Sequence, residues 1–164
     1  MIKLGIQLDS FVGSALISMY AKCGLIEDAR LMFDIIMNRD GVSWNAMIAG
    51  YAQHGFDNEA LKMFEELQRT GVKPNEVTFI GILSACSHAG LVDEGLRYFN
   101  SMYEDYCIAP RAEHYACIID LLGRAGRLEE AKEFVNKATC EPNSSMWGAL
   151  LLVSNLLTML RENP

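Results

Sequence analysis

The sequence predicts an all-α protein, a right-handed α-solenoid superhelix of antiparallel helix-turn-helix repeats. One phrase occurs four times in varied form: YAKCGLIEDARLMF from Tyr20, YAQHGFDNEALKMF from Tyr51, CSHAGLVDEGLRYF from Cys86 and LGRAGRLEEAKEFV from Leu122. The steps between these phrases are 31, 35 and 36 residues. Self-similarity at such a period is typical of stacked-repeat proteins, in which each unit buries its apolar face against its neighbours.

Each repeat is expected to open with one helix. Apolar residues recur there at helical spacing, as in Ala46, Ile48, Ala49 and Ala52. The spacing predicts first helices over residues 14–22, 45–53, 80–88 and 116–124.

A turn and a second helix are expected to follow. A glycine occupies the same place in every phrase, and glycine adopts the left-handed conformation that ends a helix without steric cost. Acidic residues come next and favour the positive end of a helix dipole. A small residue and, four positions later, a large apolar residue then share one face, and we interpret the large one as core. The glycines are Gly24, Gly55, Gly90 and Gly126; the small residues are Ala29, Ala60, Gly95 and Ala131; the large ones are Phe33, Phe64, Phe99 and Val135; the predicted second helices are 26–37, 57–70, 92–107 and 128–138.

Composition limits the possible functions. The chain has 164 residues, 51% of them hydrophobic, and no apolar run approaches the roughly 18 residues that a membrane span needs. Five cysteines form no CxxC pair and are interpreted as reduced, buried thiols. Three histidines lack HxxxH or HxE spacing, so neither a metal site nor a cofactor is predicted.

The net charge of −7 has the wrong sign for a nucleic-acid binder, because lysine and arginine supply much of the affinity for phosphate. The acids are unevenly distributed, however. The predicted second helices carry 14 acidic and six basic residues, whereas the first helices carry Asp120 against Lys22 and Arg124. If the first helices line the concave side, we expect an almost uncharged groove that permits phosphate binding but assists it weakly.

Three segments resemble pentatricopeptide repeats of the plant PLS subclass: FVGSALISMYAKCGLIEDARLMFDIIMNRD, VSWNAMIAGYAQHGFDNEALKMFEELQRTGVKPN and HYACIIDLLGRAGRLEEAKEFV. By this resemblance, residues 1–9 are the tail of a preceding repeat, followed by an S-type repeat (10–40), a P-type repeat (41–75), an L-type repeat (76–111) and a second S-type repeat (112–143). Residues 144–164 resemble the start of an E extension, and the family's expected helix pair is missing after Leu152. We expect a segment of a longer array or a truncated product.

The resemblance implies binding of single-stranded RNA, one nucleotide per repeat, with each base read by two or three side chains. A residue of each first helix would read the base together with the last residue of the repeat, while Val42 and Val77 would offer apolar surfaces for base stacking. The implied pairs are Ser14 with Asp40, Asn45 with Asn75, Ile80 with Arg111, and Ala116 with Asn143.

Two of the four pairs have side chains that could read a base. Ser14 with Asp40 resembles a purine reader that favours G, and Asn45 with Asn75 resembles a pyrimidine reader that favours C over U. The other two pairs are poor, because isoleucine and alanine side chains have no hydrogen-bonding group. Asn75 is also a good N-cap in its own right, as Asp40 is a good turn residue.

By the same resemblance we expect organellar RNA processing in a mitochondrion or chloroplast, and target recognition for C-to-U editing in particular. The chain lacks the HxE and PCxxC strings of zinc deaminases, so it is not expected to be an enzyme, and editing would need a deaminase supplied in trans. Neither a membrane nor a small-molecule substrate is expected as a partner. Two alternatives stay open: a protein-interaction solenoid of the tetratricopeptide kind, or a non-functional truncated copy.

Overall fold

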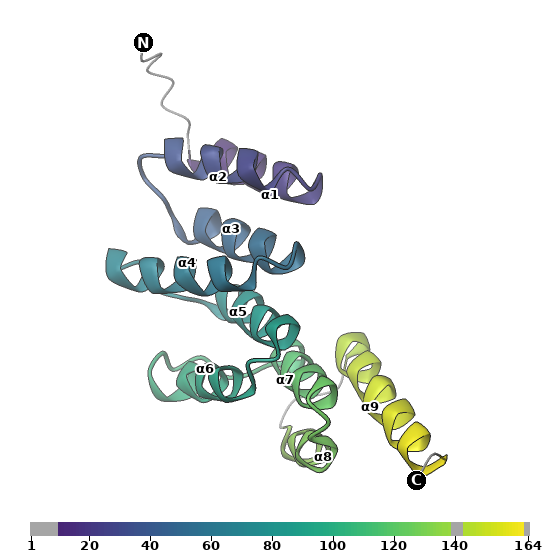
Figure 1. Cartoon of the computed structure of the whole chain (residues 1–164). Coiled ribbons are helices and arrows are strands. Elements are labelled where there is room, and N and C mark those ends of the chain that lie inside the picture. The colour runs from purple at the N-terminus through teal and green to yellow at the C-terminus, as the bar shows by residue number, and fades with distance from the viewer. Residues whose placement is uncertain (1–9, 139–142, 163–164) are drawn as a thin grey trace.

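A computed structural model of the chain describes residues 10–138 and 143–162, with side chains as far as residue 155. This part of the chain contains nine α-helices and no strand. The helices stack as successive antiparallel pairs (Figure 1), so the predicted all-α solenoid is confirmed. They are α1 (Ser10–Lys22), α2 (Ile26–Ile35), α3 (Gly41–Gln53), α4 (Asp57–Thr70), α5 (Glu76–Ala89), α6 (Val92–Glu104), α7 (Ala112–Arg124), α8 (Leu128–Lys137) and α9 (Ser144–Glu162).

The first helices of the pairs form one continuous layer. Helix α3 packs against both α1 and α5, α5 packs against α7, and α7 packs against α9. The second helices, α2, α4, α6 and α8, form the other layer, and each contacts the first helix of its own pair. Each predicted repeat therefore contains one helix pair, while the assignment of S, P and L types stays a prediction. The expected tail at 1–9 and residues 139–142 of the fourth repeat lie outside the described residues.

The first helices begin four residues earlier than the apolar spacing predicts, at residues 10, 41, 76 and 112. N-cap side chains explain two of these starts. The Asp40 Oδ1 atom accepts a hydrogen bond from the Ser43 N–H, and the Asn75 Oδ1 atom accepts one from the Thr78 N–H. Val42 consequently lies inside the first turn of α3 rather than ahead of the helix. The apolar spacing did not predict these first turns, because their apolar residues are exposed and do not recur at the spacing of the buried residues.

Helix α6 ends three residues before the predicted position of 107. Cys107 has a positive φ of 55° and the Ile108 N–H donates to the Met102 carbonyl at 2.7 Å, which terminates the helix by a left-handed turn. The predicted glycine turns are confirmed, since Gly24, Gly55, Gly90 and Gly126 have φ between 69° and 78°.

The core lies between the two layers and is rich in edge-to-face aromatic contacts. The ring of Phe64 on α4 lies 5.7 Å from Phe79 on α5 and 5.4 Å from Tyr98 on α6, centroid to centroid. Phe33, Phe64 and Phe99 are buried, as predicted. Val135, predicted to be a core residue, is only half-buried. The ring of its neighbour Phe134 lies 5.5 Å from the Phe99 ring, centroid to centroid.

The expectation of buried thiols is only partly right. Cys86 is buried and Cys117 is half-buried, and burial raises the pKa of both thiols to about 12. Cys23 and Cys107 are exposed, because each lies just beyond the end of a helix. Cys140 lies outside the described residues. Within residues 10–138 and 143–162, no helix is long and apolar enough to span a bilayer.

Candidate nucleic-acid interface

The predicted pair Asn45 and Asn75 meets across a repeat boundary. Asn45 lies on the second turn of α3, and its Nδ2 atom donates to Oδ1 of Asn75, the N-cap of α5, at 3.0 Å. Asn45 is 9% exposed, whereas Asn75 is exposed at the surface. Val42 and Val77, on the first turns of the same two helices, are 61% and 55% exposed. This boundary thus presents amide groups together with uncovered apolar side chains.

Ser14 and Asp40 line a common cavity of about 280 Å³ between α1 and α3, together with Val42. The Ser14 hydroxyl donates to the backbone carbonyl of its own helix at Phe11, and Ser14 is buried. The backbone N–H of Ser43 is the main cause that holds the pKa of Asp40 below its ordinary value. The carboxylate is therefore a hydrogen-bond acceptor in the lining of this cavity.

At the other two boundaries the polar member of each predicted pair bonds to an acidic residue. Arg111, the N-cap of α7, forms an ion pair with Glu76 at 3.0 Å. Asn143 donates through Nδ2 to Glu113 at 2.7 Å and caps α9 through Oδ1, while Ala116 is buried. Both boundaries thus involve a carboxylate, whereas the boundary between α3 and α5 pairs two uncharged amides.

One exposed apolar residue was missed by the sequence analysis. Phe11 on α1 is 77% exposed and stands at the helix position that Val42 and Val77 occupy in α3 and α5. At the same position α7 carries Glu113. Aligning the chain by its steps of 31, 35 and 36 residues places these four residues in one row, so the signal was present in the sequence.

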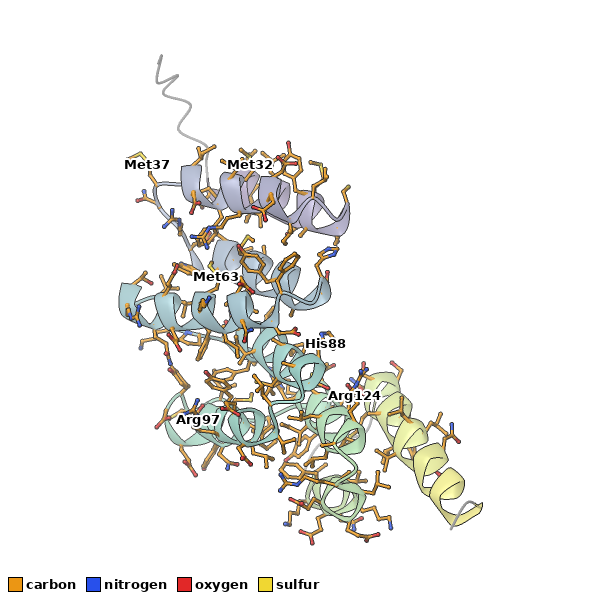
Figure 2. The ribbon with its side chains drawn as sticks, in the orientation of Figure 1. Met32, Met37, Met63, His88, Arg97 and Arg124 are labelled. Carbon is orange, nitrogen blue, oxygen red and sulfur yellow. The ribbon has the colours of Figure 1, made fainter. Side chains whose placement is uncertain are left out.

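A second row follows the opposite ends of the first helices. It consists of Lys22, Gln53, His88 and Arg124, all of which are exposed. His88 lies near the C-terminal end of α5, and Arg124 lies at the C-terminal end of α7 (Figure 2). This row contains Lys22 and Arg124, which are the only two basic residues other than histidine on helices α1, α3, α5 and α7.

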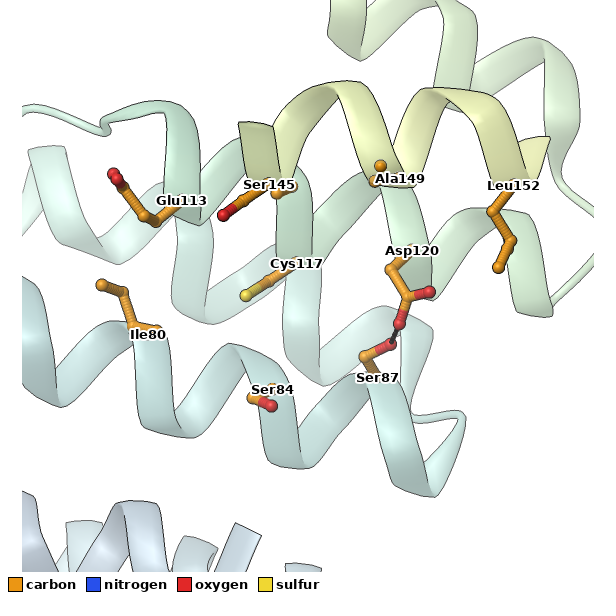
Figure 3. Close-up of a pocket in the computed structure, with 11 residues that line it drawn as sticks. Ile80, Ser84, Ser87, Glu113, Cys117, Asp120, Ser145, Ala149 and Leu152 are labelled. Atoms are coloured by element: carbon orange, nitrogen blue, oxygen red, sulfur yellow. Dashed lines mark hydrogen bonds between the residues drawn. The ribbon is translucent and has the colours of Figure 1, made fainter. Parts of the chain in front are cut away.

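The C-terminal part of the first-helix layer contains a cavity of about 370 Å³ between α5, α7 and α9 (Figure 3). Its walls are largely apolar, but they include the carboxylates of Glu113 and Asp120. Asp120 accepts hydrogen bonds from Ser87 at 2.6 Å and from Arg124 at 2.9 Å. The expectation of an uncharged groove therefore needs correction at this end. The earlier helix starts add Glu76 and Glu113 to the first helices, which the sequence analysis had not counted there.

The layer of second helices carries most of the charge, as expected. Helices α2, α4, α6 and α8 contain 13 acidic and six basic residues, and helices α1, α3, α5 and α7 contain three acidic and two basic residues. Histidine and cysteine side chains do not combine with carboxylates into a metal-binding group anywhere in the described part of the chain.

The stacked helix pairs, with amide and carboxylate side chains at the boundaries of the first-helix layer, define an α-solenoid of the helical-repeat class. Family models described as "PPR repeat family" and "PPR repeat" match the sequence, the first over residues 39–88 and the second over 14–40, 77–107 and 113–139. The chain belongs to the pentatricopeptide repeat family.

Curated relatives carry the same family name. A pentatricopeptide repeat-containing protein of Arabidopsis thaliana is 54% identical over 147 residues, which are 90% of this chain and 21% of that protein. A mitochondrial protein of the same name and organism is 49% identical over 150 residues, 92% of this chain and 20% of its own length. A chloroplastic one is 51% identical over 150 residues, 92% of this chain and 18% of its own length. The chain thus spans about a fifth of the length of these relatives.

Solved structures share the fold. The pentatricopeptide repeat protein PPR10 in complex with an 18-nucleotide psaJ RNA element has a TM-score of 0.78 and 21% identity, over 99% of this chain and 25% of that one. The PPR domain of Arabidopsis thaliana protein-only RNase P 1 in complex with tRNA has a TM-score of 0.68 and 17% identity, over 92% of this chain and 90% of that one.

Proposed function

We propose that this chain binds single-stranded RNA along its first-helix layer, and that the boundary between α3 and α5 reads one pyrimidine, cytosine in preference to uracil. The observation that carries the proposal is the contact between Asn45 and Asn75 beside the exposed side chains of Val42 and Val77. Amides can hydrogen-bond a base edge, and apolar side chains can pack against its face. The RNA complexes of the two structural neighbours support an RNA ligand for this fold.

The boundary between α1 and α3 is the second reading position. Phe11 and Val42 offer apolar surfaces there, and the Asp40 carboxylate can accept from a base that presents donors, such as guanine. The Ile80/Arg111 and Ala116/Asn143 positions contribute no base reading, because their polar groups bond to Glu76 and Glu113.

The isolated chain is expected to bind RNA weakly. Stacking contributes roughly 1–3 kcal/mol per base, and ordering of the strand offsets part of this gain. With two reading positions we expect dissociation constants in the micromolar-to-millimolar range. Titration of a labelled eight-nucleotide RNA followed by fluorescence anisotropy measures this value, and a nanomolar complex would contradict the expectation.

The double variant Asn45→Thr with Asn75→Asp is expected to move the base preference from cytosine towards guanine by about tenfold. Threonine and aspartate replace amide donors with groups that can accept, and guanine offers adjacent donors where cytosine offers adjacent acceptors. The measurement compares affinities for RNAs that differ in one base. Asn58→Asp, on the exposed surface of α4, adds the same charge away from the boundary and serves as the control. An unchanged base preference would favour a protein partner instead.

We further propose that the array belongs to the PLS subclass and recognises targets for C-to-U editing in a mitochondrion or chloroplast, with the deaminase supplied by a partner in trans. Relatives named mitochondrial and chloroplastic support an organelle, and the proposal assigns no catalytic step to this chain. Sequencing of organellar transcripts from plants that lack the gene tests the editing role. A single cytidine left unedited is the expected result, and unchanged editing with altered transcript ends would point to a different kind of RNA processing.

Protein binding is the second candidate function. Leu31 and Ile35 on α2 are 59% and 47% exposed, at helix positions where α4 carries Lys62 and Glu66. Exposed apolar residues on an otherwise charged layer are typical of a contact surface. Leu31→Lys would weaken such a partner's binding and leave RNA affinity unchanged.

A further inference from the structure

The hydrogen-bond network around Thr78 leads to an inference that rests on the proposed function and deepens it. We infer that Thr78 is a specificity-determining positioning residue: its hydroxyl holds the Asn45 and Asn75 amides with their N–H groups directed towards the RNA, and so selects cytosine over uracil.

Two backbone donors determine the orientation of the network. The Thr78 N–H donates to Asn75 Oδ1 at 3.1 Å, and the Asn75 N–H donates to Thr78 Oγ1 at 3.0 Å. A backbone N–H can only donate. The Asn75 amide must therefore direct its oxygen, and not its nitrogen, towards Thr78, which is 2% exposed.

The orientation of Asn45 follows from this arrangement. Because Asn75 directs its oxygen into the boundary, Asn45 meets that oxygen with Nδ2, at 3.0 Å. Thr78 Oγ1, which already accepts from a backbone donor, uses its own proton to donate to Asn45 Oδ1 at 2.6 Å. Each bond requires the next, so a reversed amide would place two donors or two acceptors against each other.

The groups left over are donors. Both N–H bonds of the Asn75 side chain and one N–H bond of Asn45 make no hydrogen bond to any described residue, whereas Asn75 Oδ1 already accepts from the backbone N–H of Thr78 and from Asn45 Nδ2. Cytosine offers two adjacent acceptors, O2 and N3, on its Watson–Crick edge. Uracil presents a donor at N3, which would oppose one of these N–H groups and leave both unpaired, at a cost in affinity. The arrangement therefore favours cytosine.

Equivalent residues at the neighbouring boundaries do not make this link. Ser43 in α3 donates to its own N-cap, Asp40, at 2.9 Å, and that contact does not extend to Ser14. His114 in α7 bonds to the backbone carbonyl of Glu76 at 2.9 Å instead of a side chain. Among the boundaries that the structure describes, Thr78 alone joins the N-cap residue to the reading residue of the preceding repeat.

The test is an NMR titration of the ¹⁵N-labelled chain with two short RNAs that differ only by cytosine or uracil at one position. We expect the wild-type chain to prefer the cytosine RNA by about tenfold. Thr78→Val, which keeps the shape and removes the hydroxyl, should reduce this preference to within about twofold, because the Asn45 carbonyl then loses its donor and the Asn45 amide, held only by its bond to Asn75, no longer keeps its free N–H in place. Thr78→Ser, which keeps a hydroxyl, should retain the preference for the cytosine RNA. Ser43→Ala, the matched change at the neighbouring boundary, should leave it unchanged.

A second measurement needs only the wild-type chain. Because the side-chain amide protons of Asn75 would contact the base, their resonances should shift with the cytosine RNA and much less with the uracil RNA. Equal shifts with both RNAs, or an undiminished preference in folded Thr78→Val, would overturn the role of Thr78 while leaving RNA binding intact. Failure of the wild-type chain to bind either RNA would overturn both this inference and the proposed function.

Discussion

Phe64→Ala is expected to lower the free energy of unfolding by about 3–5 kcal/mol. Phe64 is 1% exposed and sits between the two layers, where its ring contacts Phe79 and Tyr98 from the following repeat. Truncation removes the apolar contacts of the ring and leaves a cavity at the junction of two helix pairs. In a solenoid this interface is a large share of what holds neighbouring repeats together, because each repeat contacts only its neighbours. Urea unfolding followed by circular dichroism measures the change.

Leu31→Ala is the matched control for this prediction. Leu31 lies on the corresponding helix of the first pair, but it is 59% exposed, so its truncation should change stability by less than about 1 kcal/mol. Similar losses for both variants would show that the aromatic interface does not couple the repeats as the structure indicates.

His114→Ala is expected to cost about 2–4 kcal/mol of unfolding free energy, since it leaves buried polar groups without partners. His114 is completely buried between α5 and α7. Its Nδ1 atom accepts from the Arg111 N–H at 3.0 Å and its Nε2 atom meets the Glu76 carbonyl at 2.9 Å. A carbonyl only accepts, so the proton lies on Nε2 and the ring is neutral. Comparison of unfolding curves at pH 7.5 measures the loss, and a loss below about 1 kcal/mol would contradict this role.

The same histidine makes stability depend on pH. Burial is the main cause that lowers the pKa of His114 below 6.5, its ordinary value, although the nearby Glu113 carboxylate opposes this shift. The unfolded chain therefore binds a proton at His114 more readily than the folded chain does. The stability is fully present above about pH 6.5 and is lost progressively as the pH falls below that value. His114→Gln should reduce this slope between pH 6.5 and pH 5, and equal slopes for wild type and His114→Gln would contradict the assignment.

Local signals were enough to predict the repeat architecture. The glycine turns, the acidic first turns and residues such as Phe64 act within a few positions of the chain, so their consequences can be read from one repeat at a time. The starts of the first helices were placed too late because exposed residues such as Val42 interrupt the apolar spacing. Two of those helices begin at N-caps: Asn75, for which the sequence predicts this alternative role, and Asp40, for which it predicts only a turn.

The sequence by itself determined the helix pairs, their order and the uneven charge of the two layers, because these depend on short-range spacing and on composition. Tertiary structure alone decided which predicted readers meet. Asn45 reaches Asn75 and Thr78, separated from it by 30 and 33 residues, while Arg111 turns to Glu76 and Asn143 to Glu113. The physical reason is that a hydrogen bond between repeats depends on how adjacent helices are positioned. Small shifts of one helix against the next change which polar group is within 3 Å, and no local pattern specifies that distance.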